Sequence, residues 1–366
     1  MRERPRVLKT STDAPAGPGR PMRGGFYAVL GLLGLFAALQ LWWVTTAAPG
    51  VAGSARIVEI PPHLGLLGIA RRLDEAGVIR SPFGFALLAL VQGRARSLKA
   101  GEYEVPQGSN TFAVLSLLEG GKVLKHTVLL REGSTLAELA HAVEAEGLAT
   151  AADVIRVGQD PLFLRTLEIP ASTVEGYLFP DSYQFVKGAT PEEILERMVT
   201  RMRTQLSPAL LKAAEKRGFN AHQLLTLASI VEREAVVPSE LPLISAVFWN
   251  RLKRDMPLQA DPTVQYALGK GRQALTRADL QVDHPFNTYR RTGLPPGPIA
   301  NPGLAAIQAA ANPARVDYLY FVSLDDRRHQ FSHSLTDHND AVARYRLAKP
   351  HLSEPGAAAD GTGRGH

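Results

Sequence analysis

The sequence contains no cysteine. Disulfide bonds and metal sites with thiolate ligands are therefore excluded, and any part of the chain that folds outside the cytoplasm is held by packing alone. The sequence also lacks a zinc-binding HExxH motif, a Walker loop, a dinucleotide fingerprint and a nucleophile elbow. His329, His333 and His338 match no zinc-ligand spacing. We therefore expect no metal and no cofactor.

Outside the N-terminus the positive and negative charges are nearly balanced, although the net charge of the chain is +6. No stripe of basic residues alternates with aromatic ones, so we expect no nucleic-acid partner. Much of the excess lies in the first residues, where the acids are Glu3 and Asp13 and the bases are Arg2, Arg4, Arg6, Lys9, Arg20 and Arg23.

A long uncharged segment follows this basic tail, at residues 26–48. A helix of that length crosses the ~30 Å hydrocarbon core of a membrane, and Trp42 and Trp43 suit its interface. The tail, residues 1–24, should stay in the cytoplasm. The sequence thus predicts a single transmembrane helix at 25–48 in the inner (cytoplasmic) membrane, with the rest of the chain on the periplasmic side. A cleaved signal peptide is the alternative, but its apolar stretch is usually ~7–15 residues long.

A strand-then-helix pattern occurs twice in the next part of the chain. Residues 56–60 have strand character, residues 66–76 have helical spacing, and Gly77 suits the helix end. The pattern returns seventy positions later, since Val58, Ile60, Leu66, Ile69, Ala70, Leu73 and Gly77 align with Val128, Leu130, Leu136, Leu139, Ala140, Val143 and Gly147. Residues 100–105 resemble a further strand, and 111–118 a further helix. We interpret 55–158 as a small α+β region that binds rather than catalyses, because it has no cluster of acids, bases or nucleophiles.

A second, larger α+β domain is predicted at 159–349, after a boundary near 160–170. Amphipathic helices are expected at 191–206, capped by Thr190, and at 221–235. A strand at 318–322 and a helix from about residue 337 to 348 close the domain. The Gly/Ala-rich tail at 350–366 is expected to be disordered.

The candidate catalytic residue is Glu234. Along a helix it falls between Leu227 and Ile230, inside an apolar face. A carboxyl group on an apolar surface is costly to ionise, so its pKa rises toward neutrality, as a general acid requires. The alternative is a structural ion pair with Arg251 or Arg254, because buried glutamates are usually paired.

Several loop segments supply candidate substrate-binding residues. Residues 175–183 combine aromatic rings, which stack on sugars, with acids that bind hydroxyl groups, although a packed turn explains them equally well. Polar groups concentrate at 259–266, where Asp261 is the expected helix N-cap and Pro262 follows it. A proline- and glycine-rich loop at 293–303 is rigid before a ligand arrives. The candidates are Glu175, Tyr177, Phe179, Asp181, Tyr183, Glu232, Asn250, Gln259, Asp261, Thr263, Gln265, Asn287, Tyr289 and Pro295.

Seven segments, in this order, resemble the endolytic murein transglycosylases of the MltG/YceG type. They are EGYLFPDSY (175–183), ASIVEREA (228–235), FWNRL (248–252), LQADPTVQYAL (258–268), NTY (287–289), GLPPGPIANPG (293–303) and YLYFV (318–322). Each string alone is moderately specific, but the ordered set is highly specific. The N-terminal layout also resembles that family, with one membrane anchor followed by a LysM-like domain.

The resemblance implies a lyase that cleaves the β-1,4 bond between N-acetylmuramic acid (MurNAc) and N-acetylglucosamine (GlcNAc) without water, inside nascent peptidoglycan strands. It leaves 1,6-anhydroMurNAc ends, terminates strand elongation and has peptidoglycan synthases as partners. The catalytic glutamate of the family matches Glu234, with Glu232 as the fallback. A non-catalytic glycan-binding scaffold remains one alternative. A hydrolytic muramidase is another, because Glu175, Glu240 and Asp261 could each serve as the second carboxylate that hydrolysis requires.

Overall fold

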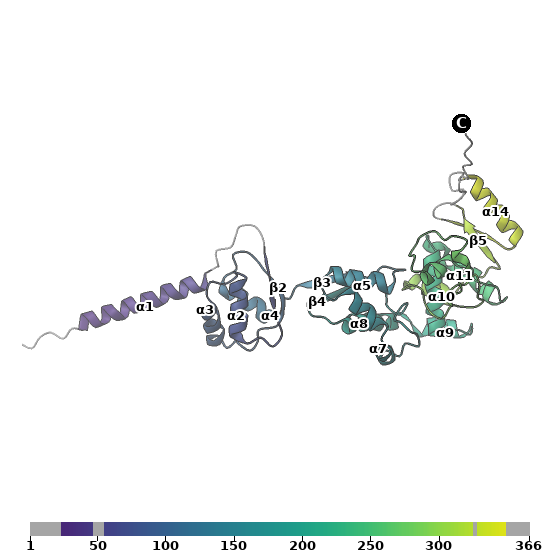
Figure 1. Ribbon diagram of the computed structural model, residues 1–366. Helices are drawn as coiled ribbons and strands as arrows, with labels where there is room; N and C mark the ends of the chain where they lie inside the picture. The colour runs from purple at the N-terminus through teal and green to yellow at the C-terminus, as the bar shows by residue number, and fades with distance from the viewer. Residues whose placement is uncertain (1–22, 47–54, 325–327, 349–366) are drawn as a thin grey trace, which may run out of the picture. The chain divides into compact units, whose positions relative to one another are not determined.

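The computed structural model describes residues 23–46, 55–324 and 328–348. The chain divides into two compact units, Met1–Val123 and Leu124–His366 (Figure 1). Helices dominate both units, and the strands form three separate two-stranded antiparallel sheets. The predicted α+β class is confirmed. The predicted disordered tail at 350–366 and most of the predicted cytoplasmic tail lie outside the described residues.

Unit 1 begins with helix α1, Arg23–Thr45. This helix covers most of the segment that the sequence predicts to be transmembrane. Its large apolar side chains that the structure describes, from Phe26 to Trp43, are exposed. Within 23–46, 55–324 and 328–348, no helix reaches the combination of length and apolar character that a membrane crossing requires.

A compact module makes up the rest of unit 1. Strands β1 (Arg56–Ile60) and β2 (Gly101–Val105) pair in antiparallel register, and helices α2 (Leu66–Glu75), α3 (Pro82–Val91) and α4 (Thr111–Gly120) cover them. Gly77 follows the end of α2 at φ +65°, where an added Cβ would lie 2.1 Å from the Arg56 guanidinium. That guanidinium donates to the carbonyls of Ala76 and Gly77. The positive φ therefore favours glycine at this turn.

Unit 2 starts with a second copy of the same arrangement. Strand β3 (Lys125–Leu129) pairs with β4 (Ser182–Val186), and between and after them lie α5 (Leu136–Ala145), α6 (Ala151–Gly158), α7 (Pro161–Thr166) and α8 (Pro191–Gln205). The repeat predicted from the sequence is confirmed, since each copy runs strand, helices, strand, helix.

The repeat extends to one buried tyrosine in each copy. Val58 faces Tyr103 across the first strand pair, and Val128 faces Tyr183 across the second. Each tyrosine hydroxyl donates to the carbonyl four residues earlier, at 2.8 Å for Tyr103 and 2.6 Å for Tyr183. The hydroxyl thereby fixes the loop that enters each second strand.

The division of the chain differs from the predicted boundary near residues 160–170. The second copy belongs to unit 2, because β3 pairs with a strand that lies beyond that boundary. Val128, Leu139 and Val154 share one buried core with Phe185 and Met198. The sequence pattern identified the repeat but not the strand that pairs with β3. That strand is β4, which follows some fifty residues later in the chain.

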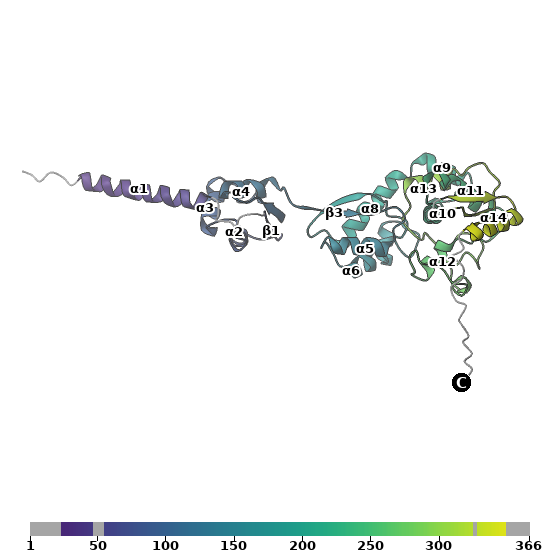
Figure 2. The ribbon, with the colours of Figure 1, turned by 90° about the horizontal axis from the view of Figure 1, so that it is seen from above.

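The remainder of unit 2 is built around helix α10, Ala221–Glu234, which packs against α9 (Pro208–Glu215), α11 (Leu241–Leu252), α12 (Asp261–Ala267) and α13 (Leu304–Ala311), the cluster seen in Figure 2. Eight consecutive residues of α10, from Leu224 to Val231, are buried. Strands β5 (Tyr320–Ser323) and β6 (His329–Ser332) pair beside the closing helix α14, Leu335–Ala348. Short 3₁₀ turns lie at Pro238–Glu240 and Asp279–Gln281.

Two predicted helix starts have different outcomes. Thr190 caps α8 and forms a capping box with Glu193, with Pro191 at the first helical position, as predicted. For α12 the prediction was wrong by one residue, because Ala260 is the N-cap and Asp261 is already helical. The Asp261 carboxylate does not cap the helix, since it accepts a hydrogen bond from the Tyr289 hydroxyl instead.

The repeated tyrosine bond yields a paired prediction. Replacing Tyr183 by Phe removes one buried hydrogen bond worth about 0.5–1.5 kcal/mol. Amide hydrogen exchange of β3 and β4 should therefore accelerate roughly two- to tenfold, as measured by mass spectrometry of the full chain. Tyr103→Phe is the reciprocal control, and should accelerate exchange in β1 and β2 alone. Equal effects of both variants on both strand pairs would contradict equivalent local roles.

Candidate active site

Helix α10 carries the candidate acid at its C-terminal end. Glu234 is the last helical residue, and Ala235 leaves the helix in an extended conformation. Because the preceding turns are buried from Leu224 to Val231, the backbone of Glu234 is fixed by core packing. Its side chain is partly buried and lies in the wall of a cavity of about 370 Å³. The other lining residues are Arg251, Leu258, Gln259, Asp261, Tyr289, Phe321, Val322, Ser323, His329 and His338.

The environment of Glu234 favours its protonated form. Burial, with the negative charge of Asp261 as a second cause, raises the pKa of Glu234 to about 8, against the opposing charges of Arg251 and Arg233. Among the described residues, none donates a hydrogen bond to the Glu234 carboxylate. Because Glu234 lines the cavity, its carboxyl group can hold a proton at neutral pH and still reach a ligand.

The alternative of a structural ion pair is not observed. No nitrogen of Arg251 or Arg254 lies within ion-pair distance of Glu234 in the described part of the chain, and Arg254 is exposed. Arg251 is buried, and its guanidinium is held by the carbonyls of Leu258 and Leu319, both at 2.8 Å. Its charge acts on Glu234 through space rather than through a direct bond.

A second acid lies in the same cavity, at the start of α12. The Tyr289 hydroxyl donates to Asp261 Oδ1 at 2.5 Å. Burial first and this bond second raise the pKa of Tyr289, so the phenol stays protonated as a donor. Gln259, at φ +51°, accepts from Arg251 Nη1 at 3.2 Å. Glu234, Asp261, Gln259 and Tyr289 are therefore four predicted site residues that the fold brings together.

Two further candidates stabilise the segments that carry Tyr289 and Asp261. Asn287 is buried, accepts a hydrogen bond from the backbone of Tyr289 at 3.0 Å, and donates to the carbonyls of Leu280 and Val282. Thr263 is a buried residue of α12, and its hydroxyl bonds to the hydroxyl of Thr288 at 2.9 Å. Neither side chain lines the cavity, and both hold the segments that place Tyr289 and Asp261.

The segment at 175–183 is positioned elsewhere in unit 2. Both oxygens of Glu175 accept from the backbone N–H of Leu136 at 3.0 Å, and Asn301 donates to one of them. Glu175 thus supports the first turn of α5, and burial raises its pKa to about 8. The other candidates of the segment make packing or surface contacts: Tyr177 with His222, Phe179 in the core, Asp181 with Arg201, and Tyr183 with the Phe179 carbonyl.

The remaining candidates also lie outside the Glu234 cavity. Glu232 accepts from the backbone N–H of Gly303 at 3.0 Å, and burial raises its pKa. Asn250 donates to the carbonyls of Val316 and Tyr318, and Pro295 is buried in its loop. Gln265 donates to the Gln273 carbonyl and lines a separate cavity together with Glu175 and Arg233.

Sequence reasoning did not place the C-terminal strands and helix in the site. Phe321, Val322 and Ser323 enter the cavity from β5, His329 from β6 and His338 from α14. The two histidines figured only as rejected metal ligands. His329 Nδ1 lies 2.7 Å from Glu240 Oε2, in a buried pair. The only signal in the sequence was the apolar strand at 318–322, and nothing in it indicated proximity to Glu234.

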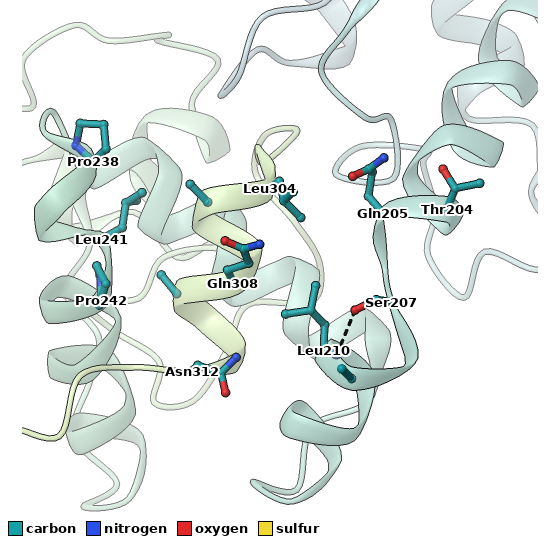
Figure 3. A pocket seen from close by; sticks show the side chains of 13 residues that line it. Thr204, Gln205, Ser207, Leu210, Pro238, Leu241, Pro242, Leu304, Gln308 and Asn312 are labelled. Atoms are coloured by element: carbon teal, nitrogen blue, oxygen red, sulfur yellow. Dashed lines mark hydrogen bonds between the residues drawn. The ribbon is translucent and has the colours of Figure 1, made fainter.

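A wider cavity, of about 820 Å³, lies between α9, the start of α11 and α13 (Figure 3). Its wall consists of small, apolar and amide side chains, including Leu241, Gln308 and Asn312, and Ser207 caps α9 beside it by accepting from the N–H of Leu210. None of its lining residues is an acid or a base. Proton transfer therefore has no donor there. The separate cavity lined by Glu175 does contain an acid, but both oxygens of Glu175 accept from the backbone N–H of Leu136, whereas the carboxyl group of Glu234 has no donor among the described residues. The Glu234 cavity is therefore the candidate active site.

Fold and site together define a mixed α+β protein with a carboxyl group of raised pKa in a polar cleft. The model of the YceG-like family matches residues 58–344, so the chain belongs to that family. It is 34% identical over 308 residues to the endolytic murein transglycosylase of Bacillus subtilis (strain 168), covering 80% of this chain and 85% of the relative. It is 31% identical over 320 residues to the enzyme of that name from Streptococcus pneumoniae serotype 2 (strain D39 / NCTC 7466), covering 79% of this chain and 58% of the relative.

A solved structure of a YceG-like protein is also similar to this chain. The crystal structure of a putative YceG-like protein from Listeria monocytogenes aligns with a TM-score of 0.56 at 33% sequence identity. The alignment covers 79% of this chain and 99% of that one. The resemblance inferred from the seven segments is thus confirmed at the level of the family.

The site geometry predicts how Asp261 controls the acid. In Asp261→Asn the negative charge that opposes ionisation of Glu234 is lost, so the pKa of Glu234 should fall below about 8. The measurement is a pH titration of ¹³C-labelled glutamate carboxyl groups by NMR, with Glu234→Gln identifying the signal. Asp181→Asn is the matched control, because Asp181 pairs with Arg201 outside the cavity. An unchanged or higher pKa in Asp261→Asn would refute the coupling.

Proposed function

We propose that this chain is an endolytic murein transglycosylase, a lyase acting on peptidoglycan glycan strands. It cleaves the β-1,4 bond between MurNAc and GlcNAc without water and leaves 1,6-anhydroMurNAc ends. The observation that carries the proposal is the carboxyl group of Glu234, which is kept protonated near neutral pH in the wall of a polar cavity. The curated relatives of the chain bear the same enzyme name.

In the first step Glu234 acts as general acid. Its carboxyl proton passes to the oxygen that links MurNAc C1 to the next sugar, and the C1–O bond breaks. The released sugar carries the proton as a hydroxyl group, and positive charge develops at C1 of the muramyl ring. A pKa of about 8 keeps most of the group protonated at neutral pH, which this step requires.

In the second step the same residue acts as general base. The Glu234 carboxylate takes the proton of the muramyl C6 hydroxyl, and the C6 oxygen forms a bond to C1. The residue is thereby returned to its protonated form, and no water enters the product. One carboxyl group suffices for both proton transfers, because the nucleophile belongs to the substrate itself.

Asp261 stabilises the charge that develops between these steps. As an anion bonded to the Tyr289 hydroxyl, it contributes negative potential to the cavity in which C1 becomes positive. The same charge raises the pKa of Glu234. A single ionised side chain thus supports both the proton on the acid and the cationic transition state.

A hydrolytic muramidase is the second candidate function, because the cavity holds a second carboxylate. Asp261 could hold a water molecule or act as nucleophile, which the inverting and retaining glycosidases require of their second acid. Mass spectrometry of the released reducing ends distinguishes the two reactions. The lytic product is lighter than the hydrolytic product by one water molecule.

The decisive variant for the proposed function is Glu234→Gln. Release of anhydromuramyl ends from uncrosslinked glycan should fall about 10²–10⁴-fold, because the proton donor is lost while the shape is kept. The folded wild type disfavours ionisation of this group, so it loses stability as pH rises from the ordinary glutamate range toward about 8. The variant lacks that loss and should melt at least as high at pH 7 and above.

Glu232→Gln is the matched control, two residues away on the same helix. Glu232 bonds the backbone N–H of Gly303 and lies outside the cavity, so its variant should retain most of the activity. Full activity of Glu234→Gln would refute the assignment of the acid. Loss in Glu232→Gln alone would transfer that role to Glu232. A wild type that binds glycan but creates no chain ends would favour the scaffold alternative.

We also propose that the two α+β modules, which begin at β1 and at β3, guide the glycan strand to this site. The order β1, α2, α3, β2 in unit 1 supports the LysM-like interpretation of the sequence, and LysM-like modules bind glycan. The module of unit 1 has a complete buried core of its own. Binding would then hold the polymer while Glu234 cuts within it.

The proposed location is the outer face of the cytoplasmic membrane, with the N-terminus inside and synthases of new strands as partners. The uncharged segment at 26–48 and the exposed apolar side chains of α1 support an anchor. The full chain expressed in a bacterium should remain in the membrane pellet after a carbonate wash, whereas a chain starting at Val51 should be released. Release of both would contradict anchoring by this segment.

A further inference from the structure

One residue that lines the active-site cavity carries a nitrogen with no hydrogen-bond partner among the described residues. His338 lies on α14 and lines the cavity with Glu234. Its Nδ1 atom is buried, and among the described residues it has no hydrogen-bond partner. Buried polar atoms are nearly always paired, so an unpaired one on a residue that lines a cavity is a candidate contact for a bound ligand.

The orientation of this imidazole is fixed by its neighbours. The ring of His338 stacks on Tyr320, with centroids 5.3 Å apart and an interplanar angle of 27°. The Arg251 guanidinium lies 5.2 Å from the centroid of the same Tyr320 ring. Burial, aided by the charge of Arg251, lowers the pKa of His338. The ring is therefore neutral at pH 7 and offers one N–H donor and one nitrogen acceptor.

We propose that His338 is a substrate-binding residue whose Nδ1 atom makes a hydrogen bond to a hydroxyl or acetamido group of the saccharide next to Glu234. The inference rests on the proposed function, because it names the ligand of the same cavity. It assigns a role in the site to the C-terminal helix: α14, packed on β5, closes the cavity with a rigid hydrogen-bonding group.

A structural role for the imidazole is the rival interpretation. The hydroxyl of Ser332 is also buried and without a partner among the described residues. Ser332 faces Tyr320 across the β5–β6 pair, and His338 stacks on that tyrosine. A small side-chain rotation could pair the two orphan groups. Ser332 does not line the cavity, so its variant separates this rival from substrate binding.

The test compares three substitutions of His338 in the full-length protein. In His338→Asn the side-chain amide can replace Nδ1, in His338→Gln it reaches the position of Nε2, and in His338→Phe the stacking on Tyr320 is kept without any nitrogen. Release of new chain ends from uncrosslinked glycan is followed at several substrate concentrations. The kcat/KM value should fall roughly tenfold in the Phe and Gln variants, the effect of one hydrogen bond, and by less than about threefold in the Asn variant.

Ser332→Ala should retain wild-type kcat/KM. The inference is overturned if the kcat/KM value of His338→Asn falls as far as that of His338→Phe, or if all three His338 variants match the wild type. It is also overturned if Ser332→Ala shows the same loss of kcat/KM. Melting temperatures of all variants identify unfolding, and the Asn–Gln comparison still decides if the Phe variant does not fold. If the chain ends released by the wild-type protein carry an added water molecule, the lytic reaction is contradicted. The comparison of the His338 variants stays valid, because new chain ends of either kind are counted.

Discussion

The site depends on the removal of one carboxyl group from water. Helix α10 is buried over two full turns before Glu234, so the core decides where that side chain emerges and how little solvent it meets. Burial is the largest cause of its raised pKa, and Asp261 adds to it. The acid is therefore tuned by packing, and mutations in the core around α10 should affect chemistry as well as stability.

The position of Glu234 was predictable because its cause is local. Helical periodicity alone placed Glu234 on the buried face of its helix, and the polar segment before α12 pointed to Gln259 and Asp261. The supporting wall was not predictable. Phe321, His329 and His338 reach the cavity through long-range packing of β5, β6 and α14, and no local pattern records such a contact. The aromatic segment at 175–183 was misleading in isolation, since Glu175 bonds the start of α5 rather than lining this cavity.

The fold shows the same division between local and distant information. Strands, helices and caps such as Thr190 followed from spacing and capping rules, and the internal repeat was visible as aligned apolar positions. The division of the chain into two units was not predictable from the sequence, because it depends on which strand pairs with β3. The repeated bond from Tyr103 and Tyr183 shows that the two copies share detail below the level of the sequence pattern.

The position of Glu234 as the last residue of α10 has a consequence of its own. The aligned peptide dipoles of a helix place a partial negative charge at its C-terminal end, and this charge disfavours an anion there. The backbone therefore biases the carboxyl group toward protonation whatever side chains surround it. This backbone contribution adds to burial and to the charge of Asp261, and it persists when neighbouring side chains are replaced.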